Sequence, residues 1–282
     1  MITFSHPKDP SRDFCQWDYP RPSEVHSRSI RQENIIFGAA EQLDPSGHTL
    51  ELLRLVQKAA GHFNTVWGLK NSGAKSSIEL YFYDYERTFT TTSPDIILNS
   101  VSQLLSAGFH VPTTTPFFMW SMEINPTEDK IIKDIDLYFS GAGGTISSGE
   151  CYTLGVNYYE FKNIYYFFES EQDKELIYEA LTSGPRAKII TDFPSFLHPG
   201  MASEQVYVVA RKRFSDGIYL SRVPLDKSIE ILKQAEFNQS VRNFLEKNYS
   251  SLEHHLYDIG IDYKINFQND FSIEKSAIYG IF

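Results

Sequence analysis

The feature that most constrains the fold of this chain is a pair of strand-like segments that recurs five times. Each pair shows period-two alternation around a short polar connection, which is typical of a β-hairpin. The pairs begin roughly 35 to 55 residues apart, and such regular spacing indicates repeated supersecondary units. The segments are residues 64–70 with 77–85, 117–125 with 134–140, 153–159 with 163–169 (turning at 160–162), 206–214 with 217–223, and 256–265 with 271–282.

Amphipathic runs with helical spacing lie between most of these pairs. Ser93 and Pro94 are suited to the N-cap and first position of one such helix. Residues 1–35 are polar and proline-rich, so we expect an extended N-terminal arm, held by Phe14, Trp17 and Tyr19, before one domain over residues 36–282. The helices are expected at residues 49–60, 96–105, 171–181, 225–235 and 240–247.

Antiparallel hairpins and helices together place the chain in the α+β class. A ten-stranded antiparallel sheet avoids exposed edges best by closing, so we expect a single antiparallel barrel of five hairpins surrounded by helices. Segment 77–85 agrees with this prediction: Ile78, Leu80 and Phe82 share one face, and Glu79 and three tyrosines share the other. Two α+β domains with open sheets are the alternative, but no Gly/Ser/Pro-rich linker divides the chain.

Composition narrows the function classes. The chain carries 26 Lys and Arg against 36 Asp and Glu, for a net charge of −10, which excludes the basic footprint of a nucleic-acid-binding protein. Two cysteines exclude a disulfide framework and a cysteine-based zinc site. We see neither a signal peptide nor an apolar run long enough for a membrane span, and we expect a cytoplasmic protein with free thiols.

Several strand pairs resemble those of a known enzyme family. Residues 154–159 with 164–169, and 206–209 with 218–220, resemble aromatic prenyltransferases of ABBA type, in particular the compact cyanobactin-type peptide prenyltransferases. The resemblance covers residues from about 60 to 282 in topology and includes no motif. It implies a transferase that moves an isoprenoid from an allylic diphosphate to an aromatic or peptide acceptor inside a barrel. Residues 256–263 and 275–282 also resemble an uncharacterised bacterial family, which implies no function.

The resemblance also implies residue roles. In that family, inward Lys and Arg hold the diphosphate, Tyr side chains screen the allylic cation, and a carboxylate acts as the base. Alternation puts Arg211 and Arg213 on one face and Lys212 on the other, and leaves open which face points inward. The candidates are Glu79 and Glu123 as base; Tyr81, Tyr83, Tyr138 and Tyr166 as substrate-binding tyrosines; and Lys212, Arg213, Arg222 and Lys275 as diphosphate contacts.

Acidic side chains at several inward positions depart from the family pattern. Glu79, Asp134 and Asp136 stand where the family tends to carry bases, so magnesium that bridges to the diphosphate is the one cofactor considered, and no resident metal site is predicted. Asp258 and Asp262 share a strand face, which suits either magnesium or plain solvent exposure. The glycine-rich residues 140–149 are a connector or a lid.

The same acidic balance supports an alternative function. A non-catalytic module that holds a peptide or protein partner, in the cavity or on an acidic aromatic surface, needs no inward cations. The charge of the barrel interior discriminates between the two functions, because a net negative interior does not suit a diphosphate.

Overall fold

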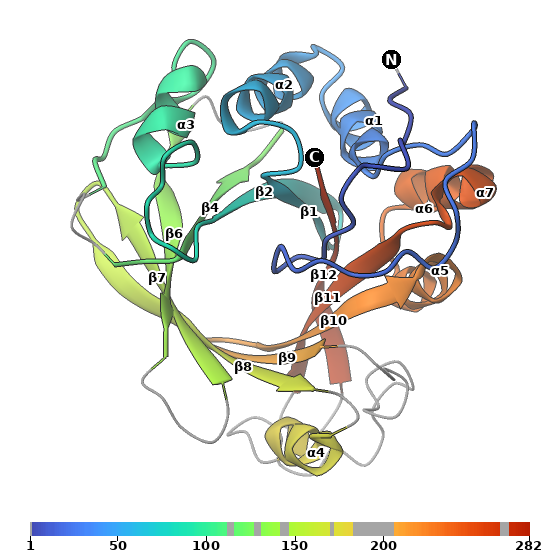
Figure 1. Cartoon of the computed structure of the whole chain (residues 1–282). Helices are drawn as coiled ribbons and strands as arrows, with labels where there is room; N and C mark the ends of the chain where they lie inside the picture. The colour runs from blue at the N-terminus through green and yellow to red at the C-terminus, as the bar shows by residue number, and fades with distance from the viewer. Residues whose placement is uncertain are drawn as a thin grey trace.

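The computed structural model describes residues 2–111, 116–126, 131–141, 147–169, 172–182, 206–265 and 271–282. Its main element is one closed antiparallel barrel (Figure 1). The strands of the barrel are β1 (Val66–Ser72), β2 (Lys75–Tyr83), β4 (Met119–Ile124), β6 (Asp134–Ser140), β7 (Ser147–Gly155), β8 (Tyr159–Glu169), β9 (Val206–Lys212), β10 (Asp216–Pro224), β11 (Leu256–Ile265) and β12 (Phe271–Ile281).

The ring closes where the first and last strands meet. β1 pairs with β12 in antiparallel register, with Val66 opposite Ile281 and Lys70 opposite Ala277. The strand order around the ring is β1-β12-β11-β10-β9-β8-β7-β6-β4-β2, so both halves of the sequence contribute to one sheet. The predicted α+β fold with a single ten-stranded barrel is confirmed, and the alternative of two separate open sheets is wrong.

The third hairpin differs from its predicted position. We predicted strands 153–159 and 163–169 with a turn at 160–162, but β7 and β8 pair Leu154 with Tyr159, which places the turn at residues 156–158. Gly155 permits this turn, because a Cβ there would lie 2.4 Å from the ring of Tyr158. Lys162 is therefore a strand residue of β8. The glycine-rich segment enters β7 at Ser147, and its residues 142–146 lie outside the described ranges.

Helices cover much of the outer surface of the barrel (Figure 1). All five predicted helices are present in the described ranges, and α3 begins as expected, with the Ser93 hydroxyl accepting the N–H of Ile96. The sequence analysis missed α1, α7 and a small parallel pair of β3 (Ser106–Ala107) and β5 (Ile131–Ile132). The helices are α1 (Glu33–Leu43), α2 (His48–Ala60), α3 (Pro94–Ser100), α4 (Lys174–Thr182), α5 (Leu225–Gln234), α6 (Gln239–Lys247) and α7 (Tyr249–Leu252). None of them is long and apolar enough to cross a membrane.

The two faces of the barrel wall have different chemistry. On β2, Ile78, Leu80 and Phe82 are fully buried in the main hydrophobic core, which packs the outer face of the strands against the helices. The intervening Glu79 and Tyr81 line cavities inside the barrel. The period-two alternation of the sequence therefore sends aliphatic side chains outward and polar aromatic ones inward, as predicted for this strand.

The N-terminal arm crosses one mouth of the barrel and ends where α1 begins (Figure 1). Asp13 is buried and forms an ion pair of 2.9 Å with Arg222 of β10. The N–H of Phe14 donates to Asp258 of β11 over 2.7 Å, and the Tyr85 hydroxyl donates to the carbonyl of Cys15 over 2.8 Å. Asp13, Phe14, Cys15, Gln16 and Trp17, here called the arm tip, are thereby fixed to three parts of the wall.

We predict that Arg222→Ala destabilises the protein by roughly 3 kcal/mol, because it leaves the Asp13 carboxylate buried without its cation. Urea unfolding measures this loss, and limited proteolysis measures the expected release of the arm. Arg54→Ala, on the exposed surface of α2, is the matched control and should change neither. Equal stability of Arg222→Ala and the wild type would show that the ion pair does not hold the arm.

Candidate functional site

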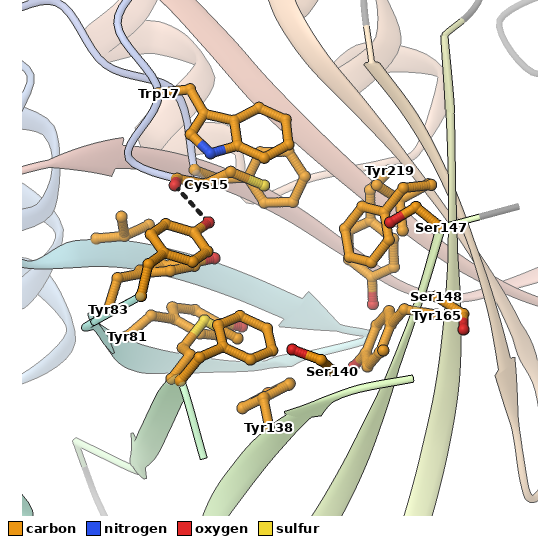
Figure 2. Close-up of a pocket in the computed structure, with 18 of the residues that line it drawn as sticks. Cys15, Trp17, Tyr81, Tyr83, Tyr138, Ser140, Ser147, Ser148, Tyr165 and Tyr219 are labelled. Carbon is orange, nitrogen blue, oxygen red and sulfur yellow. Dashed lines mark hydrogen bonds between the residues drawn. The ribbon is translucent and has the colours of Figure 1, made fainter. Parts of the chain in front are cut away.

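A layer of five tyrosines divides the interior of the barrel. Their side chains line two cavities at once, one toward the arm tip and one toward the opposite mouth. Neighbouring rings touch around the layer; Tyr138 and Tyr165 have centroids 6.0 Å apart, and Tyr81 and Tyr279 5.9 Å apart. In Figure 2 the labelled members point into the cavity from different strands. The tyrosine layer consists of Tyr81, Tyr138, Tyr165, Tyr219 and Tyr279.

Glycines at inward strand positions make room for these rings. A Cβ on Gly68 of β1 would lie 2.6 Å from the ring of Tyr279, and a Cβ on Gly260 of β11 would lie 2.9 Å from the ring of Tyr219. Burial raises the pKa of all five phenols, which stay neutral at physiological pH. The layer is therefore a close-packed set of neutral aromatic rings.

The cavity on the arm side, here called the aromatic chamber, has a volume of about 360 Å³. The arm tip contributes Phe14, Cys15 and Trp17 to its wall (Figure 2). Tyr83 and Phe118 also line the chamber. Among the described residues that line the chamber, only Tyr and Cys are ionisable, and burial raises the pKa of the Cys15 thiol. It suits an apolar or aromatic ligand.

The cavity beyond the tyrosine layer, here called the lysine compartment, has a volume of about 430 Å³. Its charged side chains come from the strand ends that lie away from the arm tip. Six basic side chains line it (Lys70, Lys162, Lys212, Arg213, Lys264 and Lys275), as do six acidic ones (Glu79, Glu123, Asp136, Glu160, Asp262 and Glu274). Among the described residues, the basic and acidic side chains that line the compartment are therefore equal in number.

Lys70 offsets the electrostatic repulsion between two neighbouring carboxylates. Glu79 of β2 and Glu123 of β4 are cross-strand partners, and like charges directly opposite each other are unfavourable. The Lys70 amine forms an ion pair with Glu79 and lies 3.6 Å from Glu123. Lys70 lowers the pKa of Glu123 to about 2, while burial lowers the pKa of Lys70 itself to about 7.

Glu79 connects this charged group to the tyrosine layer. The Tyr81 hydroxyl donates to it over 2.5 Å, and the Ser121 hydroxyl donates over 2.6 Å. Ser121 also lies 3.3 Å from the Tyr138 hydroxyl. A continuous set of hydrogen bonds therefore runs from the tyrosine layer to Lys70.

Two further lysines are held by carboxylates. Lys162 forms an ion pair with Asp136, which outweighs the effect of burial and raises the pKa of the amine. Lys212 lies 2.6 Å from both oxygens of Asp262 and donates to the Tyr219 hydroxyl over 2.8 Å. These carboxylates keep the amines positioned at the edge of the tyrosine layer.

The structure brings most of the predicted site residues into the interior. Glu79, Glu123, Lys212 and Lys275 line the lysine compartment, and Arg213 lies at its wall beside Phe214. Tyr81 and Tyr138 belong to the tyrosine layer, and Tyr83 lines the aromatic chamber. The sequence left open which face of residues 211–213 points into the barrel. Lys212 points inward, whereas Arg211 points outward to Asp216 and the carbonyl of Ala180.

Three predicted placements need correction. Tyr166 packs against the outer hydrophobic core, because alternation along β8 turns its neighbour Tyr165 inward. Arg222 does not line either cavity, because it is paired with Asp13 of the arm. Asp258 and Asp262 do not form a pair: Asp258 accepts N–H groups of Phe14 and Arg222, and Asp262 holds Lys212.

The residues that the sequence analysis missed have identifiable signals. Lys162 and Tyr165 lie in the hairpin whose turn was misplaced, so the alternation of inward and outward side chains along β8 was not used to place them. Tyr219 and Tyr279 alternate with aliphatic residues of β10 and β12, a signal that was available. Phe14 was among the residues expected to hold the arm, but the strands that it contacts could not be predicted, because they lie more than two hundred positions away in sequence.

Comparison with known proteins gives structural likeness only. No family model matches the chain, and no curated protein matches it. The chain is similar to the crystal structure of 5-dimethylallyltryptophan synthase from Streptomyces coelicolor, with 9% identity and a TM-score of 0.43 over 87% of this chain and 94% of that one. A second structure of that enzyme, in complex with DMASPP and Trp, has 8% identity and a TM-score of 0.45 over 87% and 91% of the chains.

We predict that Lys70→Met raises the pKa of Glu123 from about 2 toward its ordinary value of 4.5, because the largest interaction that lowers this pKa is removed while burial, which raises it, remains. NMR titration of the Glu123 carboxyl carbon measures the shift. In the wild type, the lowered pKa stabilises the fold above pH 4.5, and this contribution is lost as the pH falls from there toward 2.

The stability advantage of the wild type over Lys70→Met should accordingly shrink on acidification through that range, as measured by urea unfolding. Lys75→Met changes a lysine at the exposed start of β2 and serves as the control. A Glu123 pKa that stays low in Lys70→Met would contradict the assignment of Lys70 as its partner.

Proposed function

We propose that the chain is a transferase of the aromatic prenyltransferase type, which moves an isoprenoid from an allylic diphosphate to an aromatic or peptide acceptor. One observation carries the proposal: the tyrosine layer lies between a compartment lined by lysines and a chamber lined by aromatic side chains. An allylic diphosphate has the same division, with an anionic head and a hydrocarbon tail. A donor that lies across the tyrosine layer therefore has its anionic head beside lysines and its hydrocarbon tail beside aromatic side chains.

The head group belongs in the lysine compartment. Lysine amines are compact charges that bind phosphate oxygens, and hydrogen bonds to a charged acceptor are roughly twice as strong as neutral ones. Lys212 lies beside Tyr219 at the tyrosine layer, and Lys275 comes from the neighbouring wall without an ion pair among the described residues. The carboxylates on Lys162 and Lys212 hold these amines in place before the donor arrives.

The reacting carbon then lies at the tyrosine layer. The bond from the allylic carbon to the diphosphate oxygen breaks, and its electron pair leaves with the diphosphate. The positive charge that develops on the allyl group faces neutral aromatic rings, which attract cations and exclude water. An electron pair from the acceptor in the aromatic chamber forms the new bond to carbon, and the acceptor loses a proton.

Glu79 is the better placed of the two candidate bases. It reaches the tyrosine layer through the Tyr81 hydroxyl, so a proton from the acceptor passes to Tyr81 as Tyr81 gives its own to Glu79. Glu123 is exposed, whereas Glu79 is buried, and the pKa of about 2 makes Glu123 a weak base. We assign Glu123 to positioning Lys70.

The residues present do not fit a resident magnesium ion. Magnesium prefers carboxylate and water oxygens in octahedral geometry, but Glu79, Asp136 and Asp262 already accept from lysine amines. In the described part of the chain, no three ligating side chains are grouped around a possible ion position. The positive charge for the leaving group therefore comes from the lysines in this proposal.

The wild type should bind a non-hydrolysable dimethylallyl thiolodiphosphate equally well with magnesium and with EDTA. Lys275→Met should weaken this binding about tenfold, since it removes one charge-assisted contact to the head group. Isothermal titration calorimetry measures both effects. Lys233→Met on the exposed face of α5 is the matched control. An absence of binding by the wild type, or equal weakening in the control, would overturn the proposal.

The balance of charges in the lysine compartment favours a second candidate. Because its lysines are largely paired with carboxylates, the cavity also suits a ligand that carries both charges, such as a peptide held without chemistry. Mass spectrometry of the purified protein under native conditions tests this alternative. A retained peptide together with no binding of the donor analogue would favour it, and an empty protein would count against it.

A further inference from the structure

The aromatic chamber has one wall that does not belong to the barrel. Phe14 of the arm tip lies over two members of the tyrosine layer, with ring centroids 6.5 Å from Tyr219 and 6.0 Å from Tyr279. Its ring also packs against the apolar group formed by Val66, Tyr279 and Ile281 on the inner faces of β1 and β12. Phe14 thus occupies space inside the barrel that no strand residue fills.

The arm tip is fixed in this wall by several hydrogen bonds and an ion pair. Asp13 accepts N–H groups of Cys15 and Trp17, which fix the turn that carries Phe14. Arg222 holds Asp13, and Asp258 binds the backbone N–H of both Phe14 and Arg222. The side chain of Phe14 is therefore held in one position by its backbone contacts, by the contacts of its neighbours and by the packing of its ring against Tyr219 and Tyr279.

The direction of the donor follows from the two compartments. With the diphosphate among the lysines and the allylic carbon at the tyrosine layer, the hydrocarbon tail has to extend into the aromatic chamber. The chamber leaves little room for a longer tail, because the acceptor must share its volume of about 360 Å³ and the ring of Phe14 lies over Tyr219 and Tyr279. A benzyl side chain and one isoprene unit are similar in size.

We infer that Phe14 sets the chain length of the isoprenoid donor, so that the wild type takes a dimethylallyl group and excludes a geranyl group. This inference rests on the proposed transferase function and extends it to the selection of the donor. Phe14 acts by filling the space that the second isoprene unit needs. A change of this size in an apolar pocket is worth about tenfold or more in affinity.

The test compares the full-length wild type with Phe14→Ala, using the non-hydrolysable thiolodiphosphates of dimethylallyl and geranyl alcohol in isothermal titration calorimetry. Phe14→Ala should shift the ratio of the two dissociation constants about tenfold or more toward geranyl. Phe4→Ala, the same change at an exposed position of the same arm, is the matched control and should leave the ratio unchanged. Phe14→Leu keeps an apolar side chain in place and should shift the ratio less in the same direction.

The outcomes separate this inference from the proposed function. If both analogues bind the wild type with similar affinity, or if the ratio is the same in Phe14→Ala and the wild type, Phe14 does not select the donor, and the proposed function stands. If neither analogue binds any variant, the proposed function fails and the inference fails with it. Should Phe14→Ala not fold, an unchanged ratio in Phe14→Leu overturns the inference equally.

Discussion

The pairing of β1 with β12 is the interaction on which the rest of this structure depends. It joins the two ends of the strand sequence, with Val66 opposite Ile281, and turns a ten-stranded sheet into a ring. Once the ring is closed, strand alternation sends every second side chain into a shared interior. The tyrosines, lysines and carboxylates that would decorate the open face of a sheet then face one another. Their separation into an aromatic end and a charged end follows from which end of each strand carries which residue type.

The charged side chains of the lysine compartment are stable in the interior only when they are paired with one another. A buried charge costs several kcal/mol unless it is paired, and the interior meets this requirement with lysine–carboxylate pairs drawn from different strands. Lys70 keeps Glu79 and Glu123 together across β2 and β4, and Asp262 holds Lys212 across β9 and β11, on either side of β10. The same pairs place amines next to the tyrosine layer, where an anionic head group could replace the carboxylates as their partner. The same side chains thus stabilise the interior and supply the amines that the proposed function requires.

Much of the fold could be predicted from the sequence, because it is encoded in local patterns. Alternation located most of the barrel strands, although β7 (Ser147–Gly155) overlaps the predicted segment 153–159 only at its end, and the inward face of residues 77–85 was correct from Glu79 to Tyr85. The third hairpin was misplaced because residues 160–162 were chosen as the turn, although Gly155 and Asn157 are turn-forming residues. Lys162 was therefore not assigned to a strand, and the inward position of Tyr165 was missed. The role of Arg222 could not be predicted, because its partner Asp13 is separated from it by 209 positions and lies in an arm without strand alternation. Contacts of that kind depend on the closed barrel and have no trace in local sequence.

The proposed function requires that the interior of the barrel holds an amphiphilic anion across the tyrosine layer, with the anionic head group in the lysine compartment. A crystal structure of the full chain with the thiolodiphosphate analogue of the dimethylallyl donor tests this most directly. The account predicts both phosphorus atoms in the lysine compartment near Lys212 and Lys275, and the dimethylallyl group between Tyr81, Tyr219 and Tyr279. Electron density for the analogue outside the barrel, or with its phosphates in the aromatic chamber, would contradict it.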